Sequence, residues 1–468
     1  MTLMTALNSA MSGLRSNAQV TDVISENIAN ALTPGYARRE VVLNSGGDTA
    51  PGVRVTGVRV LGDPAMVSFR REAEADFGNA EQKVGFLKRI EARFGDPASG
   101  DTLGDLLNQF EAALVSARSS PESGNRLDIV VHAAADVATR INATSRALSD
   151  ERTRADQRIG TAARELDTAL KEVRDLNLRI TESLSRSVDV SDLQLRRKTV
   201  VDEINALVPV NEIARENGKI ALYSQAGHML LDGPSADVSF SAVARVTPEM
   251  TIENGSISHL RINDIEVDAA VLGGEIGAQF EIRDTLATDI QSRLDALAVD
   301  LATRVATRDP AQPDEGPETS VFDFGGQAVS SIVGAGAALL LGVNSAISPL
   351  SGGDASLLRD GLTGGDPGDG TRLDQIVKSL TSTEGASGKT VFKMVEEIAS
   401  SIGTNRIWAE DTQTRDAARL DQARKTEAQV GVDTDAELQH LLEVEKAYAA
   451  NARVIETINA LFDDLLRI

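Results

Sequence analysis

The stretch DTDAELQHLLEVEKAYAANARVIETINALFDDLLRI, residues 433–468, carries the pattern that decides the fold. Apolar side chains recur along it at alternating spacings of three and four residues, a period of about 3.5 that is typical of a helix packing along a second helix. One asparagine interrupts this seam, and a lone seam asparagine usually costs stability and fixes register. The seam positions are Leu441, Val444, Tyr448, Asn451, Ile455, Ile458, Phe462 and Leu465.

The helix needs a partner of similar length. Gly431 suits the end of a preceding helix, and Thr434 to Glu437 has the pattern of a capping box that starts the new one. At a rise of about 1.5 Å per residue the new helix would be roughly 50 Å long. The N-terminal segment shows a matching seam at Leu3, Leu7, Ala10, Leu14, Asn17, Thr21, Ile24, Ile28 and Ala31.

The matching seams predict that the two ends of the chain pair as a coiled coil. All the residues between them would then form one large insertion between the paired helices. The alternative is that the terminal segments are unrelated amphipathic helices, each packed on its own local core, because periodicity alone does not identify a partner.

The length, composition and net charge of the chain limit the classes of protein to which it can belong. A chain of 468 residues is expected to form about two to four domains. Aromatic residues make up only 3%, so the cores must be built from Leu, Ile, Val and Ala, which favours helices. The net charge of −23 argues against binding to nucleic acid or to an anionic membrane surface. The chain has no cysteine, which excludes disulfides and thiol chemistry.

The sequence contains no membrane-spanning or cleaved targeting pattern. No apolar run reaches the roughly 18 residues that a membrane helix needs. The N-terminus lacks a basic segment followed by a continuous apolar core, so we do not expect a cleaved secretory signal. If the protein leaves the cell, we expect another route.

The interior of the chain reads as long helices around a small β unit. Residues 210–270 alternate with a period of two and contain Asn217-Gly218 and Asn254-Gly255, which are hairpin-type turns. We expect helices over residues 64–94, 102–117, 125–184, 191–207, 282–305, 354–360, 373–380 and 390–430, irregular or extended chain over 37–62, and short strands over 321–352. The predicted fold class is mainly α, with a terminal coiled coil, a long-helix bundle domain and a small β-rich subdomain (α+β overall).

Motifs for catalysis or cofactor binding are weak. Gly388-Lys389-Thr390 ends like a phosphate-binding loop, but position 383 is Thr383 where that loop needs glycine. The four histidines are not spaced as metal ligands on one helix, and no Gly-x-Ser-x-Gly elbow is present. We therefore expect no enzyme activity, no cofactor and no metal site.

The segment after the first helix carries a family motif. It reads Asn27-Ile28-Ala29-Asn30, a short spacer, and Thr33-Pro34-Gly35-Tyr36, where Pro and Gly have the type II turn arrangement. This resembles the N-terminal signature of the axial proteins of the bacterial flagellum, which are the rod, hook and hook-associated proteins. The motif residues are Asn27, Asn30, Thr33, Gly35 and Tyr36.

The C-terminal segment is similar to the hook-associated members that form the hook–filament junction. Residues 431–437 look like the entry to their last helix, and residues 446–455 continue the likeness. The chain departs from the family at Glu445-Lys446-Ala447-Tyr448, where Gln-Gln-x-Tyr is usual. An exposed β domain is often inserted in the C-terminal half, and only 321–352 could hold it here, so we expect it to be reduced or absent.

The resemblance implies a structural role in a secreted flagellar assembly. Terminal helices of many subunits would form an inner tube, with the bundle domain as its outer wall. The implied partners are further copies of the chain, the hook protein, the next junction protein, an export chaperone on the C-terminal helix and the type III export apparatus. The expected assembly and chaperone interface comprises Leu3, Leu7, Leu14, Ile24, Ile28, Leu441, Val444, Tyr448, Asn451, Ile455, Ile458, Phe462 and Leu465.

The implied domains are 1–36 with 431–468 as the inner tube, 37–209 with 271–430 as the bundle, and 210–270 as the β subdomain. Two alternatives stay open. A hook or rod axial protein would share the N-terminal motif, and a soluble coiled-coil adaptor would share the paired ends.

Overall fold

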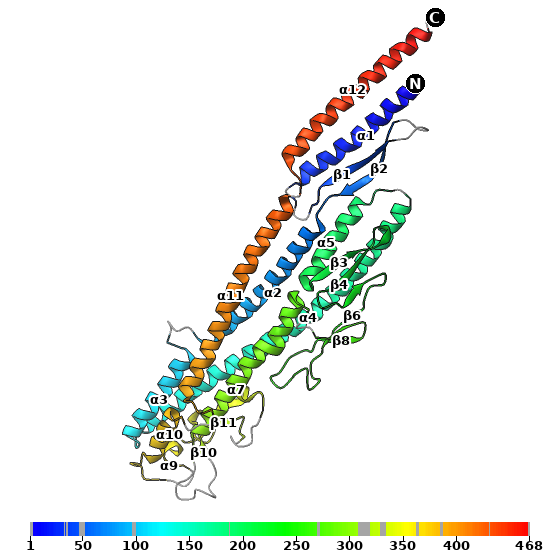
Figure 1. Cartoon of the computed structure of the whole chain (residues 1–468). Coiled ribbons are helices and arrows are strands. Elements are labelled where there is room, and N and C mark those ends of the chain that lie inside the picture. Colours follow the sequence, from blue (N-terminus) through cyan, green and yellow to red (C-terminus); the bar gives the residue numbers. More distant parts are fainter. Residues whose placement is uncertain are drawn as a thin grey trace.

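The protein is mainly helical, long and narrow, with both termini at one end (Figure 1). The computed structural model describes residues 3–31, 33, 36–45, 52–95, 100–186, 188–268, 272–307, 319–327, 334–361, 365–383, 387–429 and 431–466.

Helices form most of the described chain. They are α1 (Leu3–Asn30), α2 (Pro64–Phe94), α3 (Leu103–Ser119), α4 (Gly124–Ser185), α5 (Ser191–Leu207), the 3-10 turn η1 (Glu216–Gly218), α6 (Gly274–Glu281), the π-helical turn η3 (Ile282–Leu286), α7 (Ala287–Arg304), α8 (Ala337–Leu340), the 3-10 turn η5 (Pro349–Ser351), α9 (Leu357–Asp360), α10 (Thr371–Thr381), α11 (Val391–Gln429) and α12 (Thr434–Leu466).

Strands are short and form small antiparallel sheets. They are β1 (Arg39–Ser45), β2 (Val53–Val60), β3 (Val210–Ala214), β4 (Ile220–Ser224), β5 (Met229–Leu231), β6 (Val238–Ser239), β7 (Leu260–Ile262), β8 (Ile265–Val267), β9 (Ala306–Thr307), β10 (Thr319–Ser320), β11 (Phe322–Phe324) and β12 (Leu341–Val343). Their sheet orders are β1-β2, β3-β4-β5, β6-β7-β8, β10-β9 and β11-β12.

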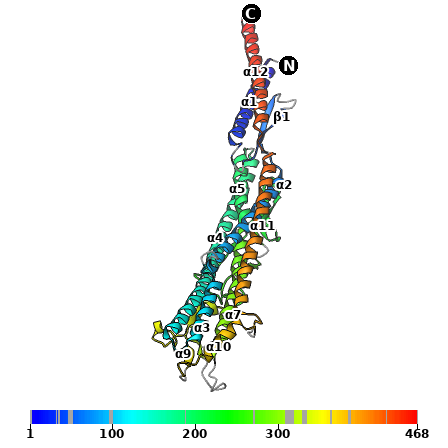
Figure 2. The ribbon, with the colours of Figure 1, turned by 90° about the vertical axis from the view of Figure 1, so that its left-hand side faces the viewer.

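The terminal helices α1 and α12 pack against each other at one end of the molecule. The hairpin of β1 and β2 packs on α1 as well. Below them α2 and α11 form a second long pair, which leads into the body (Figure 2). Apolar contacts of Ala73 and Phe77 with Leu420 and Ala423 hold this second pair together.

The body is organised around α4, whose 62 residues make it about 93 Å long. Its N-terminal half packs with α3, α7, α10 and the start of α11 in the larger hydrophobic core, which contains the aromatic pair Phe110 and Phe322. Its C-terminal half packs with α5, α6 and strands β3 to β8 in a second core. One helix therefore runs through both cores.

The β unit lies on the C-terminal half of α4, and one of its two predicted hairpins is present. Asn217 and Gly218 have φ angles of 57° and 72° and join β3 to β4. The hairpin predicted at Asn254-Gly255 is wrong. Those residues form a turn inside the long loop between β6 and β7, and the turn from β7 to β8 lies at Asn263 and Asp264, both with positive φ.

Two further segments have their expected form in part. Residues 37–62, expected to be irregular or extended, contain two extended strands, and these pair as the β1–β2 hairpin with a register shift between Val42 and Leu43. Within 321–352 the described part contains the expected short strands but also the helix α8. The expected helix over 354–360 is only the four-residue α9.

A buried arginine joins the β unit to α4. The π-helical turn η3 points Arg283 into the interior, where its side chain is fully buried. Its Nη1 lies 2.6 Å from Oδ1 of the equally buried Asp156, and its Nε lies 2.7 Å from Asp284. The guanidinium also stacks over the rings of Phe240 and Phe280. Because an extra residue per turn changes which side chains face inward, this π turn places a cation where an α-helix would not.

Replacing Arg283 by methionine should destabilise the fold by about 3–5 kcal/mol, because it leaves the Asp156 carboxylate buried without its cation. The matched control is Arg293→Met in α7, the helix that continues from η3, where the ion pair with Asp289 is half exposed and should be worth at most about 1 kcal/mol. Urea unfolding of the full chain measures both. Equal losses of unfolding free energy in the two variants would contradict this account.

Candidate assembly interface

The terminal pair is an antiparallel two-helix unit. Val444 of α12 packs between Val20 and Ile24 of α1, and Glu437 lies beside Asn27. As the residue number rises on α12 it therefore falls along α1, which brings both chain ends to the same tip (Figure 1). The expected partners in the coiled coil are thus brought together.

The predicted seam residues differ in burial. Ile24, Val444 and Ile458 are buried, with exposures of 2%, 7% and 4%. The side chain of Leu465 lies outside the described residues. The half-buried members are Leu3, Leu7, Leu14, Ile28, Leu441, Asn451, Ile455 and Phe462.

The helices approach each other closely at a glycine that the seam pattern missed. A Cβ atom at Gly13 would lie 2.7 Å from Nδ2 of Asn451, so a larger side chain would force the pair apart. The predicted polar interruption at Asn451 therefore faces a residue without a side chain. Gly13 has no side chain and precedes the seam residue Leu14, so apolar periodicity alone does not reveal this contact.

Tyr448 was predicted to lie in the seam, and the structure places it outside. Its side chain is 48% exposed. It lies between Val444, which meets Val20, and Asn451, which meets Gly13. Because the helices close up at Gly13, no space is left between them at this level for a phenol ring.

The first and last helices are also joined by a buried polar cluster around Asn27, which is 1% exposed. Its Oδ1 accepts hydrogen bonds from the Tyr36 hydroxyl (3.0 Å) and the Arg39 backbone N–H (2.9 Å). Its Nδ2 donates to the Arg39 carbonyl (2.9 Å) and to Glu437 Oε2 (3.3 Å). Glu437, also 1% exposed, pairs with Arg38. Every hydrogen-bonding position of the asparagine is thereby used.

Burial raises the pKa of the Tyr36 phenol, which keeps it protonated and able to donate to Asn27. The other family-motif residues shape the turn that follows α1. Asn30 donates to the Glu26 carbonyl, and the Thr33 backbone N–H donates to the Asn30 carbonyl. The Tyr36 backbone N–H donates to the Thr33 carbonyl (3.1 Å), as in a β-turn. Pro34 and Gly35, on which the predicted turn type depends, lie outside the described residues.

The capping box predicted at Thr434 is wrong. The helix is capped by Asp433, whose Oδ1 accepts hydrogen bonds from the backbone N–H groups of Asp435 (3.0 Å) and Ala436 (3.1 Å). Glu437 does not turn back to the helix start, because its carboxylate is held in the cluster around Asn27. Glu437 therefore makes a contact with a residue distant in sequence and does not cap its own helix.

Apolar side chains remain exposed on the terminal pair after the seam has formed. Single exposed apolar residues are common on protein surfaces, and these lie on more than one face of the helix pair. They are Met4 and Met11 of α1 and Leu438, Leu442, Tyr448, Val454 and Leu461 of α12.

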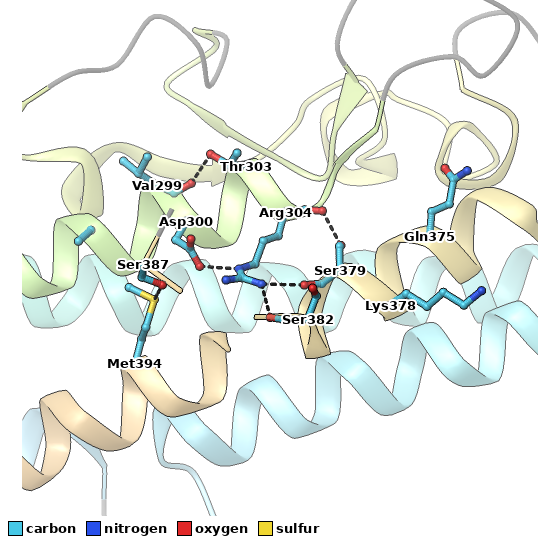
Figure 3. Close-up of a pocket in the computed structure, with 11 residues that line it drawn as sticks. Val299, Asp300, Thr303, Arg304, Gln375, Lys378, Ser379, Ser382, Ser387 and Met394 are labelled. Atoms are coloured by element: carbon cyan, nitrogen blue, oxygen red, sulfur yellow. Dashed lines mark hydrogen bonds and ion pairs between the residues drawn. The ribbon is translucent and has the colours of Figure 1, made fainter. Parts of the chain in front are cut away.

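A cavity of the body is built around a structural arginine. It has a volume of about 840 Å³ and lies between α7, α10 and the start of α11, and Figure 3 shows Arg304 at its centre. This guanidinium bonds to Asp300 and to the backbone carbonyls of Ser379 (2.9 Å), Ser382 (2.6 Å) and Lys389 (2.5 Å). Its N–H groups thus satisfy backbone carbonyls near the end of α10 and before the start of α11.

Two other kinds of site are absent from the described part of the chain. The described residues contain no cluster of three or more potential metal ligands. Among them no helix is long and apolar enough to cross a membrane.

Sequence models of known protein families match both ends and the middle of the chain. The model of the helical domain of flagellar hook-associated protein FlgK matches residues 87–310. The model of flagella basal body rod proteins matches residues 7–36, and that of the C-terminal part of the flagellar basal body rod proteins FlgEFG matches residues 428–468.

Relatives match along the whole chain. Flagellar hook-associated protein 1 of Salmonella typhimurium is 24% identical over 551 aligned positions, which cover 99% of each chain. The protein of that name from Bacillus subtilis is 21% identical and covers 98% of this chain and 97% of its own. The solved structure of the hook junction protein FlgK from Burkholderia pseudomallei aligns with a TM-score of 0.46 and 15% identity over 56% of this chain and 47% of that one.

Both terminal segments match models of flagellar basal body rod proteins, and the two terminal helices pair with each other. These features define an axial protein of the bacterial flagellum. The chain belongs to the family of flagellar hook-associated protein 1. That family is a structural component of the flagellum and not an enzyme family, as the sequence predicted.

Replacing Asn27 by alanine should loosen the link between α1 and α12, because the Tyr36 hydroxyl and both Arg39 backbone groups lose this partner and the Glu437 carboxylate keeps only Arg38. Each such orphaned group costs about 1–3 kcal/mol. Tryptic cleavage at Arg38 and Arg39 should then be at least about tenfold faster, since cleavage follows the population of opened molecules.

The control is Asn30→Ala, which removes only exposed hydrogen bonds. It should change the cleavage rate by less than about twofold. If both variants were cleaved at the same rate, the cluster around Asn27 would not be holding the junction.

Proposed function

We propose that this chain is a structural subunit of the bacterial flagellum that joins the hook to the filament by head-to-tail self-assembly of its terminal helices. One observation carries the proposal. The terminal pair matches axial-protein models at both ends and keeps a set of apolar side chains exposed. The names of the sequence relatives support a position at the hook, since those described above are hook-associated proteins.

The mechanism is packing. Side chains such as Leu442, 56% exposed in the single chain, become buried when copies stack. Full burial of one such leucine is worth about 1.5–3 kcal/mol. A contact between two different surfaces of the same chain does not close within a pair, which is how rings and tubes arise.

The proposed interface combines two sets of residues with separate tasks. Ile24, Val444 and Ile458 lie between the helices and hold the pair together. A direct contact of these three with a neighbour would require the pair to open. Tyr448 and the other exposed apolar residues can reach a neighbour, or a chaperone bound to α12, without any rearrangement.

The proposed division into domains follows the same logic. Residues 1–36 with 431–468 would form the inner tube, 37–209 with 271–430 the outer helical wall, and 210–270 the β subdomain on that wall. The alignment with the Salmonella typhimurium relative is 551 positions long and covers 99% of both chains, so that relative is longer than these 468 residues. The difference supports a reduced or absent outer domain here.

The proposed partners are the hook protein on one side, the next junction protein on the other, and further copies laterally. Export through the flagellar type III apparatus, with a chaperone on α12, would bring the chain to a secreted position on the flagellum. The match of the FlgK helical domain to residues 87–310 favours this role over that of a hook or rod protein.

The experiment is replacement of the chromosomal gene. Cells without the chain should build hooks but no attached filaments, and should release unassembled filament protein. Leu438→Asp with Leu442→Asp should fail to restore filaments, because both leucines are exposed in the single chain and their replacement removes apolar contacts to other molecules without changing the inside of the helix pair. Electron microscopy of cells and immunoblots of the medium measure the two effects.

The matched control is Leu178→Asp on α4, which changes a leucine that is 57% exposed but lies away from the terminal pair. It should restore filaments as the unchanged gene does. Attached filaments in the deletion strain would contradict the proposed function.

A further inference from the structure

Helix α1 lies between two elements that face in different directions. It packs with α12 and with both strands of the β1–β2 hairpin, and Figure 1 shows α12 on one side of it and the hairpin on the other. The terminal part of one copy therefore presents the hairpin on one flank and α12 on the other. Side-by-side copies would bring the hairpin of one against α12 of the next.

The hairpin flank is basic and partly apolar. Its exposed arginines are Arg54 and Arg59, and Arg59 is already paired with Glu40 across the strands at 2.8 Å. Arg54 has no carboxylate within ion-pair distance in the described part of the chain. Beside it Val42 and Val53 are each 39% exposed.

The α12 flank offers the complementary chemistry. Glu445, Tyr448, Ala449, Ala452 and Glu456 follow one another at spacings that place them on one face of a helix. Both glutamates are exposed and neither has an ion-pair partner among the described residues. The two alanines between them leave room for a long side chain to lie against the helix, with the exposed tyrosine ring beside it.

Both flanks lie at the same height along α1. The backbone N–H of Val53, the residue before Arg54, donates to the Ser12 hydroxyl (3.1 Å). The next residue of α1, Gly13, is the one that meets Asn451. Arg54 thus lies level with the middle of the acidic face, with Glu445 about 9 Å to one side of Asn451 along the helix axis and Glu456 about 7.5 Å to the other.

We propose that Arg54 of one copy docks on the face of the next copy's α12 between Glu445 and Glu456, over the ring of Tyr448. The occupant of this face is thus a second copy of the same chain, and the inference rests on the proposed function, whose lateral contact it specifies. The guanidinium gains two carboxylate partners and an aromatic face, which attract a cation through charge and through the ring quadrupole. Because the two surfaces differ, the contact propagates around a ring.

Charge reversal tests this contact in cells. Arg54→Glu makes both flanks acidic, and Glu445→Arg with Glu456→Arg makes both basic. Each variant alone should reduce the number of cells with filaments by about tenfold or more, because like charges meet at every copy. Coexpression of the two should restore filaments, since alternating copies then place an acidic flank against a basic one at each contact.

The control for a general effect of charge is Arg146→Glu on α4, an exposed arginine that also lacks an ion pair among the described residues. It should form filaments normally. Filaments in either reversed variant alone, or none on coexpression, would overturn the contact while leaving the proposed function standing. Filaments in the deletion strain would overturn both.

Cross-linking supplies a readout that does not depend on filament growth. The chain contains no cysteine, so Val53→Cys in one copy and Ala449→Cys in another introduce the only thiols. Isolated flagella from cells expressing both variants should give a disulfide-linked dimer on mild oxidation, and flagella with either variant alone should give about tenfold less. An equal dimer yield in all three preparations would overturn the contact.

Discussion

The structure depends on the contact between Asn27 and Glu437, two side chains 410 positions apart that are both almost fully buried. A buried carboxylate is costly unless it is paired and hydrogen-bonded, and Arg38 and Asn27 together satisfy this one. The contact joins the first helix of the chain to the last. It also holds α1, α12 and the start of the β1–β2 hairpin as one unit, so the flanks of that unit keep a defined orientation.

The terminal helices combine two tasks that could conflict. A pair must bury its apolar residues to be stable, whereas an assembling subunit must expose some. This chain separates the tasks by face. Val20, Ile24 and Val444 lie inside the pair, and Gly13 lets the helices close around Asn451. Leu438, Leu442 and Tyr448 stay outside.

Much of the fold could be predicted because it depends on local periodicity. The long helices, the Asn217-Gly218 hairpin and the pairing of the chain ends follow from spacing and turn chemistry. The missed features depend on contacts distant in sequence. Glu437 matched a local cap, yet its partner is Asn27. Gly13 carries no apolar signal, although it decides where the helices meet and why Tyr448 is excluded. The π turn at Arg283 is invisible to a search based on 3.6-residue periodicity.

The central claim is that the terminal pair is already folded in the single chain and that its exposed faces, not its seam, meet other copies. Hydrogen–deuterium exchange of the purified, unassembled chain tests it most directly. The account predicts protected amides through α1 and α12, slowest near Asn27 and Glu437 and faster toward the tip where the chain ends lie, as expected for a pair fixed at its base. Exchange of both helices at the rate of unstructured peptide would contradict it, because the pair would then form only during assembly.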